Sequence, residues 1–307
     1  MPVNQWRASF SSLMRSMRSA TKAAVEAPSN SDAPAAFPAG HFYSPIASLS
    51  EIQRREGRIF GAPSSFGGID LNEEGQRAMV AGLSSHFSQE ALPENKEAGL
   101  RFYYNNPNFG RGEALIYSSM LSYLRPKHVI EIGSGFSTLL LLDTLDRIGA
   151  TETACVCIEP HPDLLDSLLP PEDRGRVEIH RCQVQDADLT WFDALEEDDV
   201  LFIDSTHVSK TGSDVNFELF EILPRLHSGG YVHFHDVYFP FEYPRAWVYQ
   251  GRNWNEVYLI RAFLQYNREF RIVCFNSYLG AMHPELFEQS DPMFLKHHGS
   301  SLWLRRE

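Results

Sequence analysis

The chain has 307 residues, of which 43% are hydrophobic, and this length suits one large domain or one domain with an N-terminal extension. Its formal net charge of −13 argues against nucleic acid as the main partner, because phosphate contacts need basic patches. No apolar run approaches the roughly 20 residues of a transmembrane segment, and the four cysteines show neither a disulfide framework nor a zinc-binding spacing, so we expect a cytoplasmic protein.

Residues 1 to 40 are predicted to form an extension that is separate from the main domain. Residues 4 to 25 place apolar side chains at spacings of four and three, which predicts a helix with one apolar stripe, and several basic residues give this helix a positive charge. Residues 27 to 40 are rich in Pro, Ala, Ser and Asn and are typical of a linker. The expected partner of the helix is its own domain or a second subunit, which would make a homo-oligomer; a membrane surface is the alternative.

Residues 41 to 125 are predicted to form a cap of helices and loops. Helices are expected over residues 72–87 and 113–124, and the second ends before Pro126 and leads into the first strand. Between these helices, residues 101 to 110 are aromatic and polar. The aromatic side chains either contribute to a substrate pocket or belong to the core, and both interpretations stay open at this point.

Residues 126 to 307 show a regular alternation of strands and helices. Strands are expected at 128–132, 154–159, 176–180, 200–204, 230–235, 270–275 and 301–305. Helices are expected at 137–149, 162–169, 190–196, 213–226 and 254–266. This alternation predicts an α/β fold with a parallel, Rossmann-like sheet and helices on both of its faces.

The stretch from Val129 to Thr138 reads Val-Ile-Glu-Ile-Gly-Ser-Gly-Phe-Ser-Thr and predicts a buried strand, a tight turn and the start of a helix. Gly133 and Gly135 allow the backbone to turn sharply and to approach a ligand closely. Ser137 or Thr138 can cap the helix that follows. A strand-turn-helix unit directs free backbone N–H groups at a bound molecule, so the sequence predicts a site for a small polar ligand.

This turn differs from the Gly-x-Gly-x-x-Gly fingerprint of dinucleotide sites, because Thr138 stands at the third glycine position. Glu131 lies just before the turn, where a carboxylate suits a cationic ligand better than a phosphate. The pattern Glu-x-Gly-x-Gly-x-Ser resembles motif I of the class I S-adenosylmethionine-dependent methyltransferases. The resemblance implies that the amino-acid part of the cofactor is bound at Glu131, Gly133, Ser134, Gly135, Ser137 and Thr138.

Further candidate residues stand at the carboxyl ends of the predicted strands, where open α/β sheets bind their ligands. Glu159 ends the second strand and can accept two hydrogen bonds from a ribose diol, in NAD sites and S-adenosylmethionine sites alike. Gln185 and Asp186 follow the third strand. In the methyltransferases that the chain resembles, this position often contacts the adenine amino group.

Asp204 ends the fourth strand, and His235 and Asp236 end the fifth. These strand ends are expected to be neighbours, so the two carboxylates would repel each other unless one is protonated or a cation lies between them. Oxygen ligands of this kind suit Mg2+. His207 and His235 are also candidate general bases, because histidine titrates near neutral pH. Asp204 is expected to contribute to the cofactor site as well, whereas His233 is expected to belong to the core.

Two longer runs, at residues 202–216 and 232–244, resemble a bacterial group of class I enzymes, the methyltransferase-24 type. Metal-dependent O-methyltransferases of antibiotics and sugars place an Asp after the fourth strand and an acidic pair after the fifth. The resemblance therefore implies a site for Mg2+ or another divalent cation at Asp204, His235 and Asp236, although His235 replaces the first acid of that pair. It also implies that the last two strands form an antiparallel hairpin.

These observations predict an S-adenosylmethionine-dependent methyltransferase that methylates a hydroxyl group of a small molecule or a sugar, with a metal ion or a histidine assisting. Aromatic segments at residues 238–247 and 254–258 are expected to form a lid or a wall for this acceptor. One alternative is an NAD(P)-dependent oxidoreductase, although the third glycine and a second substrate domain are missing. The other is a non-catalytic module that binds a cofactor.

Overall fold

The computed structural model describes residues 36–61, 66–87, 92–288 and 292–307. The helix predicted at 4–25 and most of the linker lie outside the described residues, and the predicted boundaries at residues 40 and 125 stay predictions. The chain divides into two compact units, Met1–Glu51 and Ile52–Glu307. In the described part of the chain, we find no helix with the length and apolar character needed to cross a membrane.

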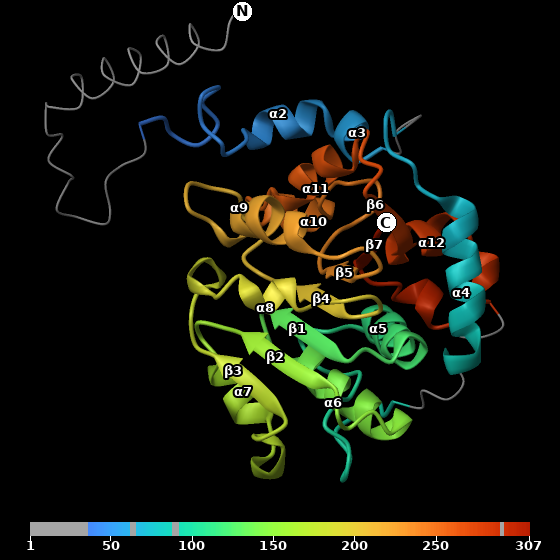
Figure 1. Ribbon diagram of the computed structural model, residues 1–307. Helices are drawn as coiled ribbons and strands as arrows, with labels where there is room; N and C mark the ends of the chain where they lie inside the picture. The colour runs from blue at the N-terminus through green and yellow to red at the C-terminus, as the bar shows by residue number, and fades with distance from the viewer. Residues whose placement is uncertain (1–35, 62–65, 88–91, 289–291) are drawn as a thin grey trace, which may run out of the picture. The chain divides into compact units, whose positions relative to one another are not determined.

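The second unit is built on a seven-stranded sheet with the order β3-β2-β1-β4-β5-β7-β6 (Figure 1). The strands are β1 (His128–Ile132), β2 (Ala154–Ile158), β3 (Val177–His180), β4 (Val200–Ile203), β5 (Tyr231–Phe234), β6 (Phe270–Phe275) and β7 (Leu302–Arg306). The first five strands are parallel, and β7 pairs antiparallel with both β5 and β6. The predicted fold class is therefore confirmed, and the final hairpin has the expected direction.

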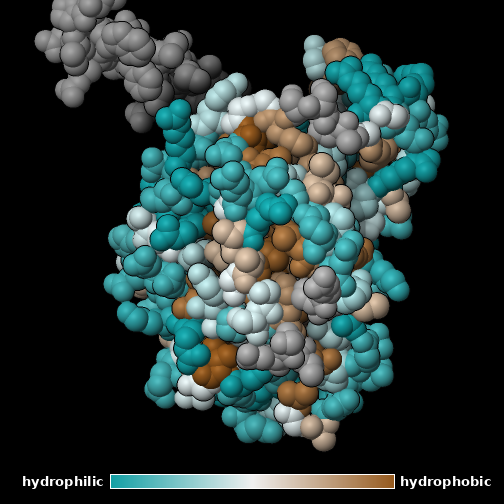
Figure 2. Space-filling model, turned by 90° about the vertical axis from the view of Figure 1, so that its right-hand side faces the viewer, coloured by the Kyte–Doolittle hydropathy of each residue, from teal (hydrophilic) through white to brown (hydrophobic). Residues whose placement is uncertain are grey.

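Helices cover both faces of this sheet (Figure 1). The helices of the described chain are α2 (Leu49–Arg54), α3 (Glu56–Ile59), α4 (Glu73–Phe87), α5 (Arg111–Leu124), α6 (Phe136–Ile148), α7 (Asp163–Leu168), α8 (Thr190–Asp193), α9 (Asp214–Phe217), α10 (Arg245–Tyr249), α11 (Glu256–Leu264) and α12 (Asn276–Met282). The apolar run 139–142 of α6 is fully buried, as the packing of this helix on the sheet requires. On the side that carries α4, hydrophilic residues dominate the surface, and hydrophobic residues are exposed at several places between them (Figure 2).

Two predicted helices differ from those in the structure. The helix expected at 213–226 is α9 followed by a π-helical turn, Glu218–Ile222, and a 3-10 turn, Leu223–Arg225. Pro224 has no amide hydrogen for a regular helix, which explains why the last turn tightens. The helix expected at 190–196 is only the single turn of α8.

Arg101 joins the segment before α5 to two buried carboxylates. Its Nε and Nη2 atoms donate to both oxygens of Asp173, each at 2.7 Å, and its Nη1 donates to Asp143 Oδ1 at 2.8 Å. The same Asp143 side chain accepts from the backbone N–H groups of Arg101 and Phe102 at 2.9 and 2.8 Å. The hydrogen bond from Arg101 lowers the pKa of Asp173.

We predict that Arg101→Met lowers the free energy of unfolding by about 3 kcal/mol, because buried Asp143 loses its ion pair with Arg101 and buried Asp173 is left with the longer contact to Arg176, at 3.7 Å. Urea denaturation measures this change. Since the pKa of Asp173 is lowered in the folded state, its contribution to stability is present above the unfolded pKa and is lost as pH falls through the folded pKa. The difference between the two proteins should therefore shrink in acid.

The control is Arg225→Met, whose ion pair with Asp193 lies on the surface and contributes at most about 1 kcal/mol. Equal destabilisation by the two substitutions would contradict the importance of the buried carboxylates.

Candidate active site

The glycine turn after β1 packs directly against the end of β4. Gly133 has a φ of +86°, and a Cβ atom at this position would overlap the carbonyl oxygen of Asp204. The backbone N–H of Gly133 donates to Ile158 O at 3.0 Å, and that of Asp204 donates to Ile132 O at 2.9 Å. Glycine is therefore required at 133 by both the backbone conformation and the close approach of the next strand.

Glu131 lies beneath this turn and has no exposed surface. Thr138 Oγ1 donates to its Oε2 at 2.5 Å, and Tyr117 OH donates to its Oε1 at 3.0 Å. Burial raises the pKa of Glu131 to about 7, although these hydrogen bonds lower it. Because both oxygens are occupied inside the protein, the geometry argues against the predicted direct contact of Glu131 with a ligand and favours a role in shaping the turn.

The predicted cap of α6 needs a correction. The helix begins at Phe136 with Gly135 as its N-cap residue, and neither Ser137 nor Thr138 occupies that position. Thr138 Oγ1 instead accepts from the backbone N–H of Gly135 at 3.2 Å. Ser134 Oγ is buried and has no hydrogen-bond partner among the residues that the structure describes.

The other predicted cofactor residues lie at the same edge of the sheet as the turn. Glu159 follows β2, and its Oε1 accepts from the backbone N–H of His161 at 2.8 Å. Gln185 and Asp186 belong to a 3-10 turn after β3, and Gln185 Nε2 donates to Gly212 O at 2.9 Å. One carboxylate oxygen of Glu159 thus accepts a hydrogen bond within its own loop. The contacts of Glu159, Gln185 and Asp186 with a cofactor stay predictions.

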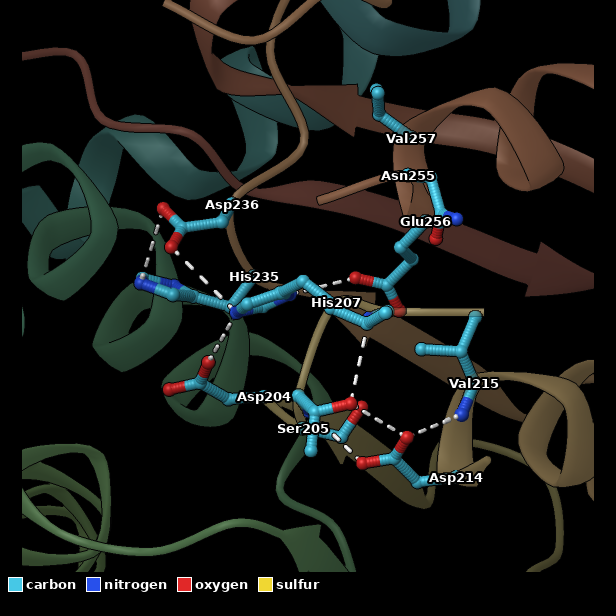
Figure 3. Close-up of polar contacts among 12 residues, drawn as sticks. Asp204, Ser205, His207, Asp214, Val215, His235, Asp236, Asn255, Glu256 and Val257 are labelled. Atoms are coloured by element: carbon cyan, nitrogen blue, oxygen red, sulfur yellow. Dashed lines mark hydrogen bonds and ion pairs between the residues drawn. The ribbon is translucent and has the colours of Figure 1, made fainter. Parts of the chain in front are cut away.

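Asp204, His207, His235 and Asp236 converge next to the turn, and His207 lies between the two aspartates (Figure 3). His207 Nε2 is 3.3 Å from Asp204 Oδ1 and 3.7 Å from Asp236 Oδ2. His235 Nε2 is 3.7 Å from Asp236 Oδ1. The expected convergence of the ends of β4 and β5 follows from their parallel pairing.

The sequence did not indicate Glu256, which holds the other side of the His207 ring. Its Oε2 lies 2.7 Å from His207 Nδ1 (Figure 3). Glu256 is in the first turn of α11, where an acidic residue is common because it complements the helix dipole. No local pattern distinguishes such a residue from one that contacts a distant histidine.

Both candidate bases have raised pKa values. Burial lowers the pKa of His207, but the hydrogen bonds with Asp204 and Glu256 outweigh burial and raise it well above its usual value. Burial likewise lowers the pKa of His235, and the charges of Asp204 and Asp236 reverse the direction. These raised pKa values favour the protonated form of each ring, which disfavours the role of general base that the sequence suggested for them.

His233 and His235 occupy different surroundings. His233 is fully buried in β5, with its ring stacked on Phe202 at 4.2 Å between centroids, and burial lowers its pKa well below the usual value. The expectation that His233 belongs to the core is confirmed. The His235 ring stacks on Phe109 at 5.4 Å, and its buried Nδ1 has no hydrogen-bond partner within the described ranges.

The two aspartates differ in access to solvent. The Asp204 side chain keeps 38% of its surface exposed, whereas Asp236 keeps 14%. Desolvation raises the pKa of Asp204, but His235 and His207 lower it more strongly, to about 2. Asp236 Oδ1 accepts a hydrogen bond from Ser300 Oγ at 2.9 Å. Asp204 therefore presents the more accessible ionised carboxylate.

The residues at this place do not fit the metal site that the sequence suggested. In the ranges that the structure describes, no group of three or more His, Cys, Asp or Glu side chains is arranged to hold a metal ion. A bridging Mg2+ would need to lie about 2.1 Å from an oxygen of each aspartate. His207 Nε2 instead approaches both Asp204 and Asp236.

A sheet of this order, with an antiparallel β7 and a glycine turn after β1, has the architecture expected of a class I methyltransferase. Residues 130–237 match a family model of the methyltransferase-24 type, described as a methyltransferase domain. The chain is also 37% identical over 170 residues to an uncharacterized protein of Archaeoglobus fulgidus, a match that covers 52% of this chain and 74% of that one. The chain belongs to the class I S-adenosylmethionine-dependent methyltransferases. The predicted family and enzyme class are thereby confirmed.

The solved structures to which the chain is similar are more distant in sequence. The cmcI-N160 complex with S-adenosylhomocysteine has 18% identity and a TM-score of 0.41, covering 69% of this chain and 82% of that one. The S-adenosylhomocysteine-bound methyltransferase PaMTH1 of Podospora anserina has 12% identity and a TM-score of 0.43, covering 90% and 100%. An O-methyltransferase from Bacillus cereus in complex with S-adenosylhomocysteine has 13% identity and a TM-score of 0.40, covering 84% and 97%.

Proposed function

We propose that this methyltransferase transfers the methyl group of S-adenosylmethionine to a hydroxyl group of a small molecule or a sugar, beside Asp204. The observation that carries this proposal is the close packing of Gly133 on the backbone of Asp204. Gly133 belongs to the turn that we assign to the cofactor, and the carboxylate of Asp204 is accessible to solvent. A hydroxyl that donates a hydrogen bond to Asp204 would thus lie close to the cofactor. Holding the two reactants in this way supplies much of the rate enhancement in a methyl transfer.

In the proposed reaction, the acceptor oxygen forms a bond to the methyl carbon while the bond between that carbon and the sulfonium sulfur breaks. The products are a methyl ether, S-adenosylhomocysteine and a proton. The proton passes to the Asp204 carboxylate, which is ionised at neutral pH. An oxygen that has begun to bond to the methyl group is strongly acidic, so a carboxylate of low pKa suffices as the proton acceptor.

The proposed cofactor site extends along the edge of the sheet from the glycine turn. We assign the amino-acid part of the cofactor to the backbone of residues 133–135 and to Ser134, whose buried hydroxyl lacks a partner within the described parts of the chain. We assign the ribose to Glu159 and the adenine to Gln185 or Asp186. The parallel register of β1, β2 and β3 supports this assignment, because it brings their carboxyl ends to one edge.

An aromatic wall supports an acceptor with a flat face. The Trp254 ring lies 4.5 Å from the ring of His207, and Trp247 contacts both Trp254 and Tyr238 at 5.3 Å between centroids. Small-molecule sites combine such aromatic walls with a few charged groups that fix orientation. Asp204 would provide the charged group here.

The proposed ribose contact predicts that Glu159→Ala weakens binding of S-adenosylhomocysteine by roughly 5- to 150-fold, corresponding to about 1–3 kcal/mol for the lost acceptors. Isothermal titration calorimetry measures this change. Glu178→Ala is the control, because Glu178 is an exposed acid of β3 that pairs with His180. A loss below about threefold for Glu159→Ala would refute the ribose contact.

The proposed reaction is tested by incubating the protein with methyl-labelled S-adenosylmethionine and extracted metabolites. We expect label in small molecules that carry a new methyl ether, with an equal amount of S-adenosylhomocysteine. Label on nitrogen, sulfur or macromolecules would contradict hydroxyl methylation, and release of no product would support a non-catalytic binding module.

A further inference from the structure

We propose that the His207 ring, and not a divalent metal ion, lies between the two aspartates during catalysis, so that this methyltransferase works without a metal. The catalytic part of this inference rests on the proposed function. Its structural part concerns only what occupies the space between Asp204 and Asp236, and metal binding tests it separately. The inference departs from the metal site that the resemblance implied.

The first argument is the hydrogen bonding of the ring. His207 Nδ1 lies 2.7 Å from Glu256 Oε2, and Nε2 lies 3.3 Å from Asp204 Oδ1. A carboxylate is an acceptor only, so a ring nitrogen that faces one must carry a hydrogen. With Nδ1 against Glu256 and Nε2 against Asp204, both ring nitrogens face carboxylates of the protein, and neither is directed at an open position where a metal ion could bind.

The second argument is how firmly the ring is held. The carbonyl oxygen of His207 accepts from the backbone N–H groups of Asn255 and Glu256 at 3.0 and 3.2 Å, and the Trp254 ring packs against the imidazole. His207 has a φ of +59°, a left-handed conformation that a residue with a side chain adopts when its surroundings require it. Figure 3 shows the ring reaching from this backbone into the space between Asp204 and Asp236.

The third argument is electrostatic. Two neighbouring carboxylates need a compensating positive charge, which the His207 ring supplies between Asp204 and Asp236. A metal ion placed beside the protonated ring would be repelled by it. The ring carries one positive charge where Mg2+ would carry two, so more negative charge remains near the cationic sulfonium of the cofactor. This charge would help to hold the cofactor in place.

Glu256 is the positioning residue in this arrangement. Its side chain is only 2% exposed, and its contact with Nδ1 keeps that nitrogen protonated and directs Nε2 towards the aspartates. Without the Glu256 charge, the ring could lose a proton and offer a lone pair on Nε2. Glu218 provides a matched control, because it is also fully buried but contacts Ser205 Oγ at 3.2 Å.

The test measures binding of Mn2+ by electron paramagnetic resonance, with the full-length protein saturated with S-adenosylhomocysteine. We expect no stoichiometric binding at submillimolar Mn2+ for the natural protein or for Glu218→Gln. We expect Glu256→Gln to gain Mn2+ affinity by at least tenfold, a change that a purely structural role of Glu256 would not produce. His207→Ala should also gain affinity, because it opens the space between two uncompensated carboxylates.

Stoichiometric Mn2+ binding by the natural protein that Asp236→Asn abolishes would overturn the proposal. So would activity that disappears after dialysis against EDTA and returns with Mg2+ or Mn2+; we expect such activity to change by less than twofold. Mn2+ binding by the natural protein tests the proposal even if a variant fails to fold. If no methyl transfer is found with any acceptor, the proposed function fails, whereas the Mn2+ measurement still decides what occupies the space between the aspartates.

Discussion

Replacing Gly133 by alanine is expected to weaken binding of S-adenosylhomocysteine by at least 100-fold. Two physical effects act together at this position. The left-handed conformation of Gly133 costs a residue with a side chain about 1–2 kcal/mol. In addition, the new Cβ would overlap the carbonyl oxygen of Asp204, which is backbone and cannot rotate away. The turn or the end of β4 must therefore move, and both belong to the proposed site.

The control for this prediction is Gly149→Ala, at the C-terminal end of α6 and outside the proposed cofactor site. Gly149 also has a positive φ, +66°, but a Cβ there would meet no atom within 4 Å. Calorimetry with S-adenosylhomocysteine measures affinity for both variants, and thermal unfolding shows whether each retains its fold. Normal cofactor affinity in a folded Gly133→Ala protein would contradict the assignment of this turn to the cofactor.

Asp204→Asn is expected to lower kcat by roughly 10²–10⁴-fold, the usual contribution of a positioned acid or base. The amide cannot take up the proton from the acceptor oxygen, and it also removes one of the charges that hold the His207 ring. The backbone contact with Gly133 is kept, so the affinity for S-adenosylhomocysteine should change by less than about threefold.

Steady-state kinetics and calorimetry together check this prediction. Asp236→Asn is the companion variant, since Asp236 is less exposed and also accepts a hydrogen bond from Ser300. It should reduce activity far more than cofactor binding, although by less than Asp204→Asn. If Asp204→Asn reduced cofactor affinity as much as activity, Asp204 would belong to the cofactor pocket, and another group would have to accept the proton.

The fold was predictable because its signals are local. The strand at residues 128–132 has the predicted bounds, since it contains β-branched residues and no turn former, and Gly133 follows it directly. The composite helix after β4 was predicted less well. Its apolar periodicity persists through residues 213–226, while the π-helical and 3-10 turns change the hydrogen bonding without interrupting that pattern.

The sequence by itself determined the strand, turn and helix around Gly133 and the meeting of Asp204 with Asp236, because parallel strands bring their carboxyl ends to one edge. Only the tertiary structure decided the surroundings of Glu131 and His207. Burial beneath the turn gives Glu131 a pKa of about 7, and Glu256, contributed by a distant helix, directs the His207 ring between the two aspartates. The protonation of a side chain and the geometry of a site depend on burial and on contacts between residues far apart in the chain. The spacing of residues in the sequence reveals neither the burial nor these contacts.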